Sequence, residues 1–255
     1  MIFDVLSLFP GMFESPLGES IVGKAIDRGL IEVRLHNIRD QAFDKHQMTD
    51  DRPFGGGEGM VMKPEPIIRA VDRLKASGPQ PWVILLSPQG RLFNQAVACK
   101  LSRLPRLILI CGRYEGVDER VAQSVVDEEI SIGDYILTGG ELPAMVLIDA
   151  VGRLIPGVLG NAASVEAETF AATTLEYPQY TRPQEYRGRR VPPVLLSGHH
   201  QAISDWRRGQ ALLRTKLRRP DLFSKLQLTA EDERLLGAAE REEVESGVDG
   251  DAGSG

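Results

Sequence analysis

The residues best spaced for binding chemistry lie at 131–160, where a glycine-rich loop runs directly into a strongly apolar helical segment. A glycine allows backbone conformations and close approaches that a side chain would block. Residues 141–143, Glu-Leu-Pro, then open the helix, since proline is favoured in a first turn. We predict that this loop brings main chain close to a bound molecule, and the alternative is a tight loop that only caps a strand. The glycines concerned are Gly133, Gly139 and Gly140.

Two further loops follow buried apolar runs. Residues 87–90 (Ser-Pro-Gln-Gly) follow the run 82–86, and residues 112–116 (Gly-Arg-Tyr-Glu-Gly) follow the run 107–111. Both loops stand where parallel strands would end, and ligands of open α/β sheets bind there. Neither loop has the glycine spacing that cradles a dinucleotide or a triphosphate. The sequence therefore predicts a nucleoside-like ligand that is poor in phosphate.

The elements that position these loops alternate between strand and helix. Such alternation is typical of βαβ units and a mostly parallel sheet, so the predicted fold class is α/β. The strand-like runs are 2–9, 31–38, 82–87, 107–111 and 130–132, and the helical patterns are about 17–28, 64–76, 94–103, 118–126 and 141–155.

Residues 40–63 interrupt this alternation with a long polar and glycine-rich segment. Loops of this length in compact domains are usually lids or substrate loops. The alternative is a disordered insert. Four apolar residues argue against disorder, because they could anchor the segment to the domain. These residues are Phe54, Met60, Val61 and Met62.

The character of the chain changes after Gly160. Residues 161–172 carry small and acidic residues without an apolar stripe, so we interpret them as an interdomain linker. Residues 173–246 form a second domain with a helix over 204–219 and a helix start at Thr229. Residues 247–255 are expected to be a disordered tail. The expected inward positions of the first helix are Trp206, Leu212, Leu213 and Leu217.

The charge of the chain is distributed unevenly. The net charge of −6 argues against nucleic acid, but residues 182–220 carry ten lysines and arginines against two acids. Residues 221–255 carry ten acids against three bases. This pattern predicts an RNA-binding face rich in arginine, whose planar guanidinium suits phosphate and base contacts. The alternative is an ordinary solvated helix face.

The cysteines and the N-terminus point to the cytoplasm. Cys99 and Cys111 lie in apolar contexts without metal-ligand spacing, so we expect reduced core residues. The first residues lack a positively charged start and a small-residue cleavage site, and no apolar run approaches the length of a membrane span. We expect no membrane association, and we expect no metal site built from histidine or cysteine.

Several blocks of the chain closely resemble one family, the bacterial tRNA (guanine-37 N1)-methyltransferases of the SPOUT class. The blocks are Arg-Pro-Phe-Gly-Gly-Gly at 52–57, the loop at 86–90, CGRYEGVDER at 111–120, the segment 131–160, Tyr-Thr-Arg-Pro at 180–183 and VPPVLLSGHH at 191–200. The resemblance implies a deep trefoil-knot α/β domain over residues 1–160, which binds S-adenosylmethionine in a bent shape, and a small, mainly helical, tRNA-binding C-terminal domain. The implied cofactor residues are Leu86, Ser87, Pro88, Gly90, Gly112, Arg113, Tyr114, Glu115, Gly116, Ile132, Gly133, Asp134, Tyr135, Ile136, Leu137, Gly139, Gly140 and Pro143.

The reaction implied by the resemblance needs a base and a cation. Guanine N1 must lose its proton before it attacks the methyl group, and negative charge then spreads onto O6. Arg153 matches the family's O6-stabilising arginine, and its alternative role is a cation at a helix C-terminus. The family usually has Asp-Ser-Phe where this chain has Glu168-Thr169-Phe170, so Glu168 is the expected base on a longer arm, with Glu166 as a substitute.

The resemblance also implies partners. The substrate is tRNA with G at position 37, and the enzyme is a homodimer whose active site lies at the subunit interface. We include Mg²⁺ among the cofactors that the resemblance implies, because some members of the family depend on it. A related methyltransferase for another RNA position and a non-catalytic RNA-binding relative remain alternatives. The expected substrate-binding residues are Asp50, Arg52, Gly59, Arg182, His200, Arg207 and Arg214, although Asp50 could instead form a capping pair with Asp51.

Overall fold

The computed structural model describes residues 1–43, 45–159 and 174–248, with side chains described to residue 244. The chain divides into two compact units, Met1–Ala162 and Ala163–Gly255. The expected boundary at residue 160 lies close to this division. The predicted linker 161–172 and residues 249–255 of the predicted tail lie outside the described residues, whereas residues 247 and 248 belong to the last helix instead of the tail.

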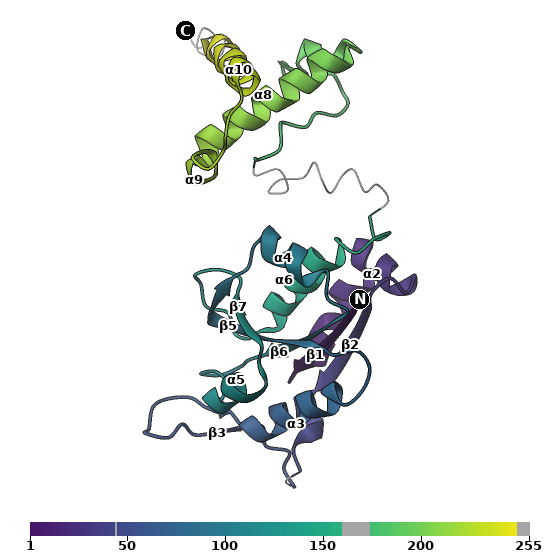
Figure 1. Ribbon diagram of the computed structural model, residues 1–255, viewed down its shortest axis with the longest axis vertical. Coiled ribbons are helices and arrows are strands. Elements are labelled where there is room, and N and C mark those ends of the chain that lie inside the picture. The colour runs from purple at the N-terminus through teal and green to yellow at the C-terminus, as the bar shows by residue number, and fades with distance from the viewer. Residues whose placement is uncertain (44, 160–173, 249–255) are drawn as a thin grey trace. The chain divides into compact units, whose positions relative to one another are not determined.

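A five-stranded sheet organises the first unit (Figure 1). Every pairing between neighbouring strands in this sheet is parallel, which confirms the predicted α/β class. The strand order is β2 (Glu32–Asn37), β1 (Ile2–Ser7), β6 (Arg106–Cys111), β5 (Trp82–Leu92) and β7 (Glu128–Ser131).

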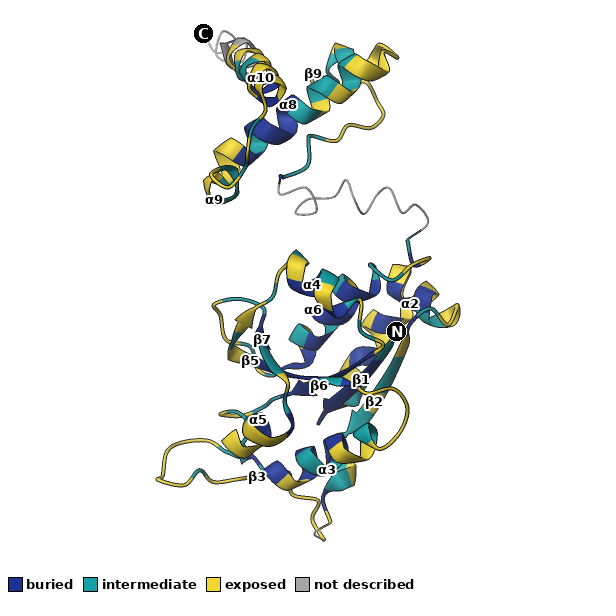
Figure 2. Cartoon of the chain, viewed as in Figure 1, coloured by how far each residue is buried: buried dark blue, intermediate teal, exposed yellow. Residues whose placement is uncertain are grey.

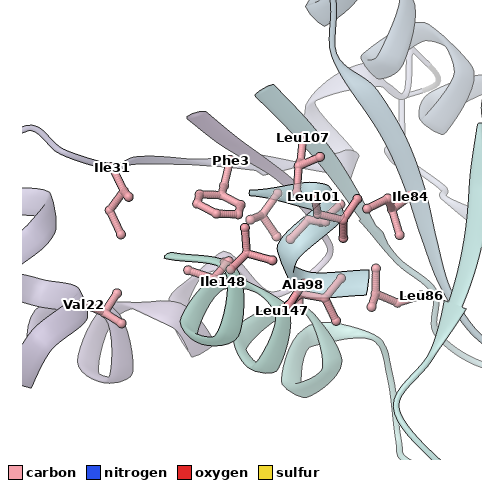
Figure 3. Close-up of a cluster of buried hydrophobic side chains, with 14 of the residues drawn as sticks. Phe3, Val22, Ile31, Ile84, Leu86, Ala98, Leu101, Leu107, Leu147 and Ile148 are labelled. Atoms are coloured by element: carbon pink, nitrogen blue, oxygen red, sulfur yellow. The ribbon is translucent and has the colours of Figure 1, made fainter. Parts of the chain in front are cut away.

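Helices cover both faces of the sheet. On one face, α2 (Ser20–Asp27), α4 (Gln95–Leu101) and α6 (Glu141–Gly152) pack on a core that includes Phe3, Ile84 and Leu147 (Figure 3). On the other face lie α3 (Pro64–Lys75) and α5 (Glu119–Val125). The central strand β6 is buried along its whole length, because both faces are covered (Figure 2).

Two predicted elements of the first unit differ in the structure. The helix expected at 17–28 is divided into α1 (Glu14–Gly18) and α2, because Glu19 is extended and Ser20 has a φ of 58°. The strand expected at 2–9 ends at Ser7, and Pro10–Phe13 forms a short 3₁₀ helix. Proline has no amide hydrogen for a sheet, which favours this early end.

The segment expected to be a loop after the third apolar run is instead part of β5. Leu86 and Arg91 both pair with Ile130 of β7, so the four residues between them form a bulge within the strand. A Cβ on Gly90 would lie 2.4 Å from the amide nitrogen of Ile130. The bulge therefore depends on glycine where two backbones meet.

The long segment 40–63 contains more regular structure than expected. It includes the end of a 3₁₀ helix (Ile38–Gln41) and the two-residue strands β3 (Asp50–Asp51) and β4 (Val61–Met62), which pair in antiparallel fashion. Met62 is fully buried and serves as the anchor, whereas Phe54 is fully exposed. The described part of this segment is therefore held on the domain by its second strand.

The second unit is mainly helical, as expected. Its core joins α8 (His200–Arg218) to α10 (Ala230–Val248). The two helices approach closely at Gly209, where a Cβ would lie 2.8 Å from the carbonyl oxygen of Leu235. A short helix α9 (Pro220–Phe223), a 3₁₀ turn at Pro193–Leu196 and a hairpin of β8 (Glu185–Tyr186) with β9 (Arg189–Arg190) complete it.

Two helix starts in this unit test the predictions. The first long helix begins at His200 instead of 204, because the ring of His199 accepts a hydrogen bond from the amide of Ala202. Thr229 caps α10 as predicted: Asp232 donates its amide to the Thr229 hydroxyl and accepts the Thr229 amide. Leu217 was expected to point inward but is 64% exposed, so that prediction is wrong.

No helix within the described residues is long and apolar enough to cross a membrane.

Candidate functional site

Three segments predicted to bind a ligand meet where β6 and β7 end and beside the bulge within β5. Leu86 pairs with Cys111, and the amide of Gly140 donates to the carbonyl of Gly112 at 2.9 Å. Arg113 forms an isolated antiparallel bridge with Gly139. Segments more than fifty residues apart in the chain are thereby brought to one edge of the sheet, where ligands of parallel sheets bind.

The glycines of these segments approach the protein's own chain. A Cβ on Gly140 would lie 2.7 Å from the Cα of Cys111, and one on Gly139 would lie 2.3 Å from Nε of Arg113. A Cβ on Gly133 would lie 2.5 Å from the ring of Tyr135. The space where a side chain would stand at these glycines is therefore taken by neighbouring backbone and side chains, and the approach of the loop to a bound molecule stays a prediction.

An ion pair between a buried carboxylate and a partly buried arginine joins these segments. Nε of Arg113 donates to Oε2 of Glu141 at 3.0 Å, and the Ser7 hydroxyl donates to Oε1 of Glu141 at 2.7 Å. Burial, and then the negative charge of Glu141, raises the pKa of the Cys111 thiol. Both cysteines carry free thiols, and Cys99 is half-buried. Sequence reasoning missed Ser7 and Glu141 as site residues, although a polar residue at the end of a parallel strand was the available signal.

The exposed side chains around this edge suit a molecule with an apolar ring and a positive charge. Tyr114, which has a φ of 61°, is 48% exposed, Tyr135 is 55% exposed and Ile136 is 82% exposed. Aromatic and apolar surfaces bind a purine ring, and the exposed carboxylate of Glu115 suits a cation. The residues present therefore fit S-adenosylmethionine, which joins an adenosine to a sulfonium.

The rest of the predicted cofactor set surrounds these groups. Ser87, Pro88 and Gly90 lie on the β5 bulge, Gly116 accepts a hydrogen bond from Met62, and Pro143 lies in the first turn of α6. Ser131 receives the amide of Gly133 at the end of β7. The remaining residues, Ile132, Asp134 and Leu137, occupy the loop between β7 and α6.

The segment predicted to handle the target base lies beside Glu115. The amide of Glu115 donates to the carbonyl of Met60 at 3.0 Å, and a Cβ on Gly59 would lie 2.5 Å from Oε1 of Glu115. Asp50 is half-buried on β3, and Arg52 is exposed. The structure therefore brings part of the expected substrate-binding set to the expected cofactor loops.

Arg153 lies at the opposite end of α6 from these loops. It caps the C-terminus of the helix through its amide, which donates to Asp149. Between it and Gly140 lies the whole of α6, whose twelve residues at 1.5 Å each are about 18 Å long. It lines a groove of about 570 Å³ together with Ser20 and Gln95. Glu168 and Glu166, the expected bases, lie outside the described residues.

Charged residues of the second unit fall into two groups. On one side of α8, Arg208 pairs with Asp232 at 2.7 Å and Lys216 pairs with Glu240 at 2.6 Å. The acidic C-terminal segment therefore neutralises part of the basic stripe by direct contact. Within the described part of the chain, four arginines of this unit form no ion pair: Arg182, Arg189, Arg214 and Arg218. Two of them, Arg214 and Arg218, line a pocket of about 160 Å³ with Tyr180.

Two more predicted RNA contacts belong to this unit. The guanidinium of Arg207 lies 4.8 Å from the ring centre of Tyr177, in a cation–π arrangement. His200 is exposed at the first turn of α8. Across the residues described, no three histidine, cysteine, aspartate or glutamate side chains are grouped to hold a metal ion.

Comparison with known proteins gives consistent matches over most of the chain. The family model described as tRNA (Guanine-1)-methyltransferase TrmD matches residues 1–225. A Geotalea uraniireducens protein named tRNA (guanine-N(1)-)-methyltransferase is 58% identical, over 94% of this chain and 98% of its own length. Proteins of the same name from Geobacter sulfurreducens and Dictyoglomus turgidum are 55% and 56% identical, over 95% and 94% of this chain and 99% and 96% of their own lengths.

The parallel sheet, its loop cluster and these matches define an α/β methyltransferase of the SPOUT class. More narrowly, the chain belongs to the tRNA (guanine-1)-methyltransferase family.

Proposed function

We propose that the protein transfers a methyl group from S-adenosylmethionine to N1 of guanine 37 in tRNA. The observation that carries this proposal is the meeting of the β5 bulge with the segments that follow β6 and β7, in a chain that matches this family over residues 1–225. The exposed rings of Tyr114 and Tyr135 and the carboxylate of Glu115 supply the surfaces that an adenosine and a sulfonium need.

The proposed chemistry needs one residue that removes a proton and another that stabilises a negative charge. The carboxylate of Glu168 takes the proton from guanine N1, and the guanidinium of Arg153 stabilises the negative charge on O6. Bound S-adenosylmethionine supplies the electrophilic methyl group, so a nitrogen–carbon bond forms as the sulfur–carbon bond breaks. Glu115 orients the cationic end of the cofactor by charge attraction.

The position of Arg153 supports a homodimer. Because about 18 Å of α6 separates Arg153 from the cofactor loops of its own copy, the proposal brings this arginine to the loops of a second copy. An apolar surface at the start of the chain and along α6 suits such a contact. Its residues, each at least 40% exposed, are Phe9, Met12, Ile21, Leu142 and Val146.

We assign tRNA binding to the second unit, residues 173–246. Its unpaired arginines, among them Arg182 and Arg214, are free to contact phosphates, while Arg207 and Tyr177 present a stacked surface. The exposed loop with Arg52 and Gly59 handles the target base beside the cofactor loops. Asp50, at the start of that loop, and His200 belong to the same proposed set.

Three further features complete the proposal. The chain of the first unit forms the trefoil knot of its class, and the protein works in the cytoplasm, where tRNA is modified. Mg²⁺ enters the proposal only as a transiently bound ion, since the described residues include no group of three His, Cys, Asp or Glu side chains that could hold it. Chelation during the assay tests this role.

The experiment is methyl transfer from labelled S-adenosylmethionine to unmodified tRNA with G at positions 36 and 37. We expect product mapped to N1 of G37, a loss of at least about a hundredfold in Glu168→Ala, and most of the activity in Glu168→Asp. A wild type that binds cofactor and tRNA without turnover, together with an active Glu168→Asp, would instead identify a catalytically impaired relative. The glutamate at position 168 is the one feature that favours this second candidate.

Mixed dimers test the shared site directly. Glu115→Ala and Arg153→Ala are each expected to be inactive. If the loops and the arginine come from different copies, mixing the two variants creates one intact site per mixed dimer and restores activity. A mixture that stays inactive, while exchange of subunits is demonstrated, contradicts the shared site.

A further inference from the structure

We propose that Glu141 is a positioning residue of the methyl-transfer site. Its carboxylate holds Arg113, so that segments 112–116 and 138–140 keep one arrangement. This inference rests on the proposed use of S-adenosylmethionine. Glu141 is fully buried in the first turn of α6, directly after the glycine loop. It does not reach the exposed edge where the ligand is proposed to bind, so its effect must pass through Arg113.

Both oxygens of Glu141 are engaged. Oε1 accepts the hydroxyl of Ser7 at 2.7 Å, and Oε2 accepts Nε of Arg113 at 3.0 Å. Ser7 is the last residue of β1, a strand that carries none of the cofactor loops. The carboxylate therefore ties the loop after β6 to the fixed end of another strand.

Arg113 carries the connection across the loops. Its Nη1 donates to the carbonyl of Thr138 at 3.2 Å, and its guanidinium lies 4.6 Å from the ring centre of Phe9. The side chain passes directly over Gly139, where a Cβ would lie 2.3 Å from Nε. One guanidinium thus holds segment 112–116 against segment 138–140. Because the side chain is committed to these contacts, Arg113 can offer a ligand mainly its backbone.

The energetics favour positioning over stability as the role of this pair. Burying the carboxylate of Glu141 costs about as much as its attraction to the partly buried Arg113 returns, so the pair adds little net stability. What such a pair adds is a single geometry, since either charge left alone would be strongly unfavourable. The positive end of the α6 dipole, at the N-terminus, also favours the carboxylate at this position.

The test compares Glu141→Gln with a matched variant that breaks another buried pair. Asp4 pairs with Arg106 at 2.7 Å, both are fully buried, and Asp4 packs toward the sheet face opposite Ser7. Asp4→Asn therefore lowers stability through a similar defect away from the loops. Ser7→Ala is the milder variant, because it removes one hydrogen bond from the same carboxylate.

The first readout is cofactor affinity by calorimetry, below the melting temperature of each variant. We expect Glu141→Gln to weaken S-adenosylmethionine binding about tenfold or more, Ser7→Ala to weaken it severalfold, and Asp4→Asn to leave it within about twofold. At saturating cofactor, kcat in Glu141→Gln should stay within about threefold of wild type, because the residue touches no reacting atom. Hydrogen exchange should increase in 112–116 and 138–140.

The outcomes separate this inference from the proposed function. Unchanged affinity and unchanged loop exchange in folded Glu141→Gln would overturn the positioning role. If Glu141→Gln does not fold, unchanged affinity in Ser7→Ala would overturn it instead. A wild type that binds no S-adenosylmethionine would overturn the proposed function itself, whatever the variants do.

Discussion

The two units of the chain use opposite charges in different ways. In the first unit, Asp4–Arg106 is fully buried, and Glu141–Arg113 pairs a buried carboxylate with a partly buried arginine; both pairs join segments far apart in the sequence. In the second unit, pairs such as Lys216–Glu240 lie on the surface, with both side chains more than 40% exposed. A buried pair fixes backbone geometry, because neither charge tolerates isolation, whereas a surface pair contributes little to stability. Under the proposed function, the arginines without such surface partners are the ones that contact RNA.

The largest expected effect is loss of the buried pair away from the site. Asp4→Ala should destabilise the first unit by about 3–5 kcal/mol, because Arg106 would remain buried without its carboxylate. Urea unfolding followed by the fluorescence of Trp82, in a variant without Trp206, measures this change. The surface variant Asp221→Ala, which removes a partner of Arg219, should stay within about 1 kcal/mol. Equal losses of stability in Asp4→Ala and Asp221→Ala would contradict the difference between a buried pair and a surface pair.

The same pair predicts a pH dependence. Burial alone would raise the pKa of Asp4, but hydrogen bonds with His36 and Arg106 outweigh it and hold the pKa below its ordinary value. The charged pair therefore contributes stability that is present above the unfolded pKa of about 3.9 and is lost as the pH falls through the folded value. The stability gap between wild type and Asp4→Asn should narrow below about pH 4. A gap that widens with acid would contradict this sign.

A smaller effect is expected where backbone packs on backbone. Gly140→Ala should cost about 1–3 kcal/mol, because the new Cβ would lie 2.7 Å from the Cα of Cys111 and main chain cannot rotate away. Thermal unfolding gives the change. Gly18→Ala is the matched control, since nothing lies within 4 Å of a Cβ there. If both substitutions are tolerated equally, the loops are less tightly packed than the structure indicates.

In the second unit, a smaller effect should come from a helix cap. Thr229→Ala removes the hydroxyl that accepts the amide of Asp232, and should cost about 1 kcal/mol. Denaturation of the chain, followed by the fluorescence of Trp206 in a variant without Trp82, reports this unit. Ser204→Ala, at an exposed position within α8, should change stability by less than about 0.5 kcal/mol.

The smallest effect on stability should accompany a clear effect on RNA binding. Arg214→Ala should weaken tRNA binding severalfold and reduce the slope of log affinity against log salt by about one, as expected for one phosphate contact. Lys216→Ala should change both much less, since Glu240 already pairs with that lysine. Binding titrations over a range of salt concentrations measure both. A larger effect in Lys216→Ala would show that the surface pairs do not select the RNA-binding residues.

The sequence by itself determined the class of fold and predicted where polar and glycine-rich segments interrupt or follow the apolar strands. Apolar runs separated by helical patterns are local signals, and the run at 107–111 became the buried centre of the sheet. The loops after it and within β5 were recognisable because glycine and polar residues interrupt apolar runs. The cap at Thr229 was equally local, since its partner Asp232 is three residues away.

Only the tertiary structure decided what those residues contact. No local pattern shows that Glu141 meets Ser7, because 134 positions separate them and the pairing depends on the order of strands in the sheet. The same applies to Gly139, whose missing side chain makes room for the pair of Arg113 and Glu141. Exposure of Leu217 also depended on where α10 crosses α8. Periodicity predicts which residues are apolar, but contact depends on how distant segments pack in three dimensions.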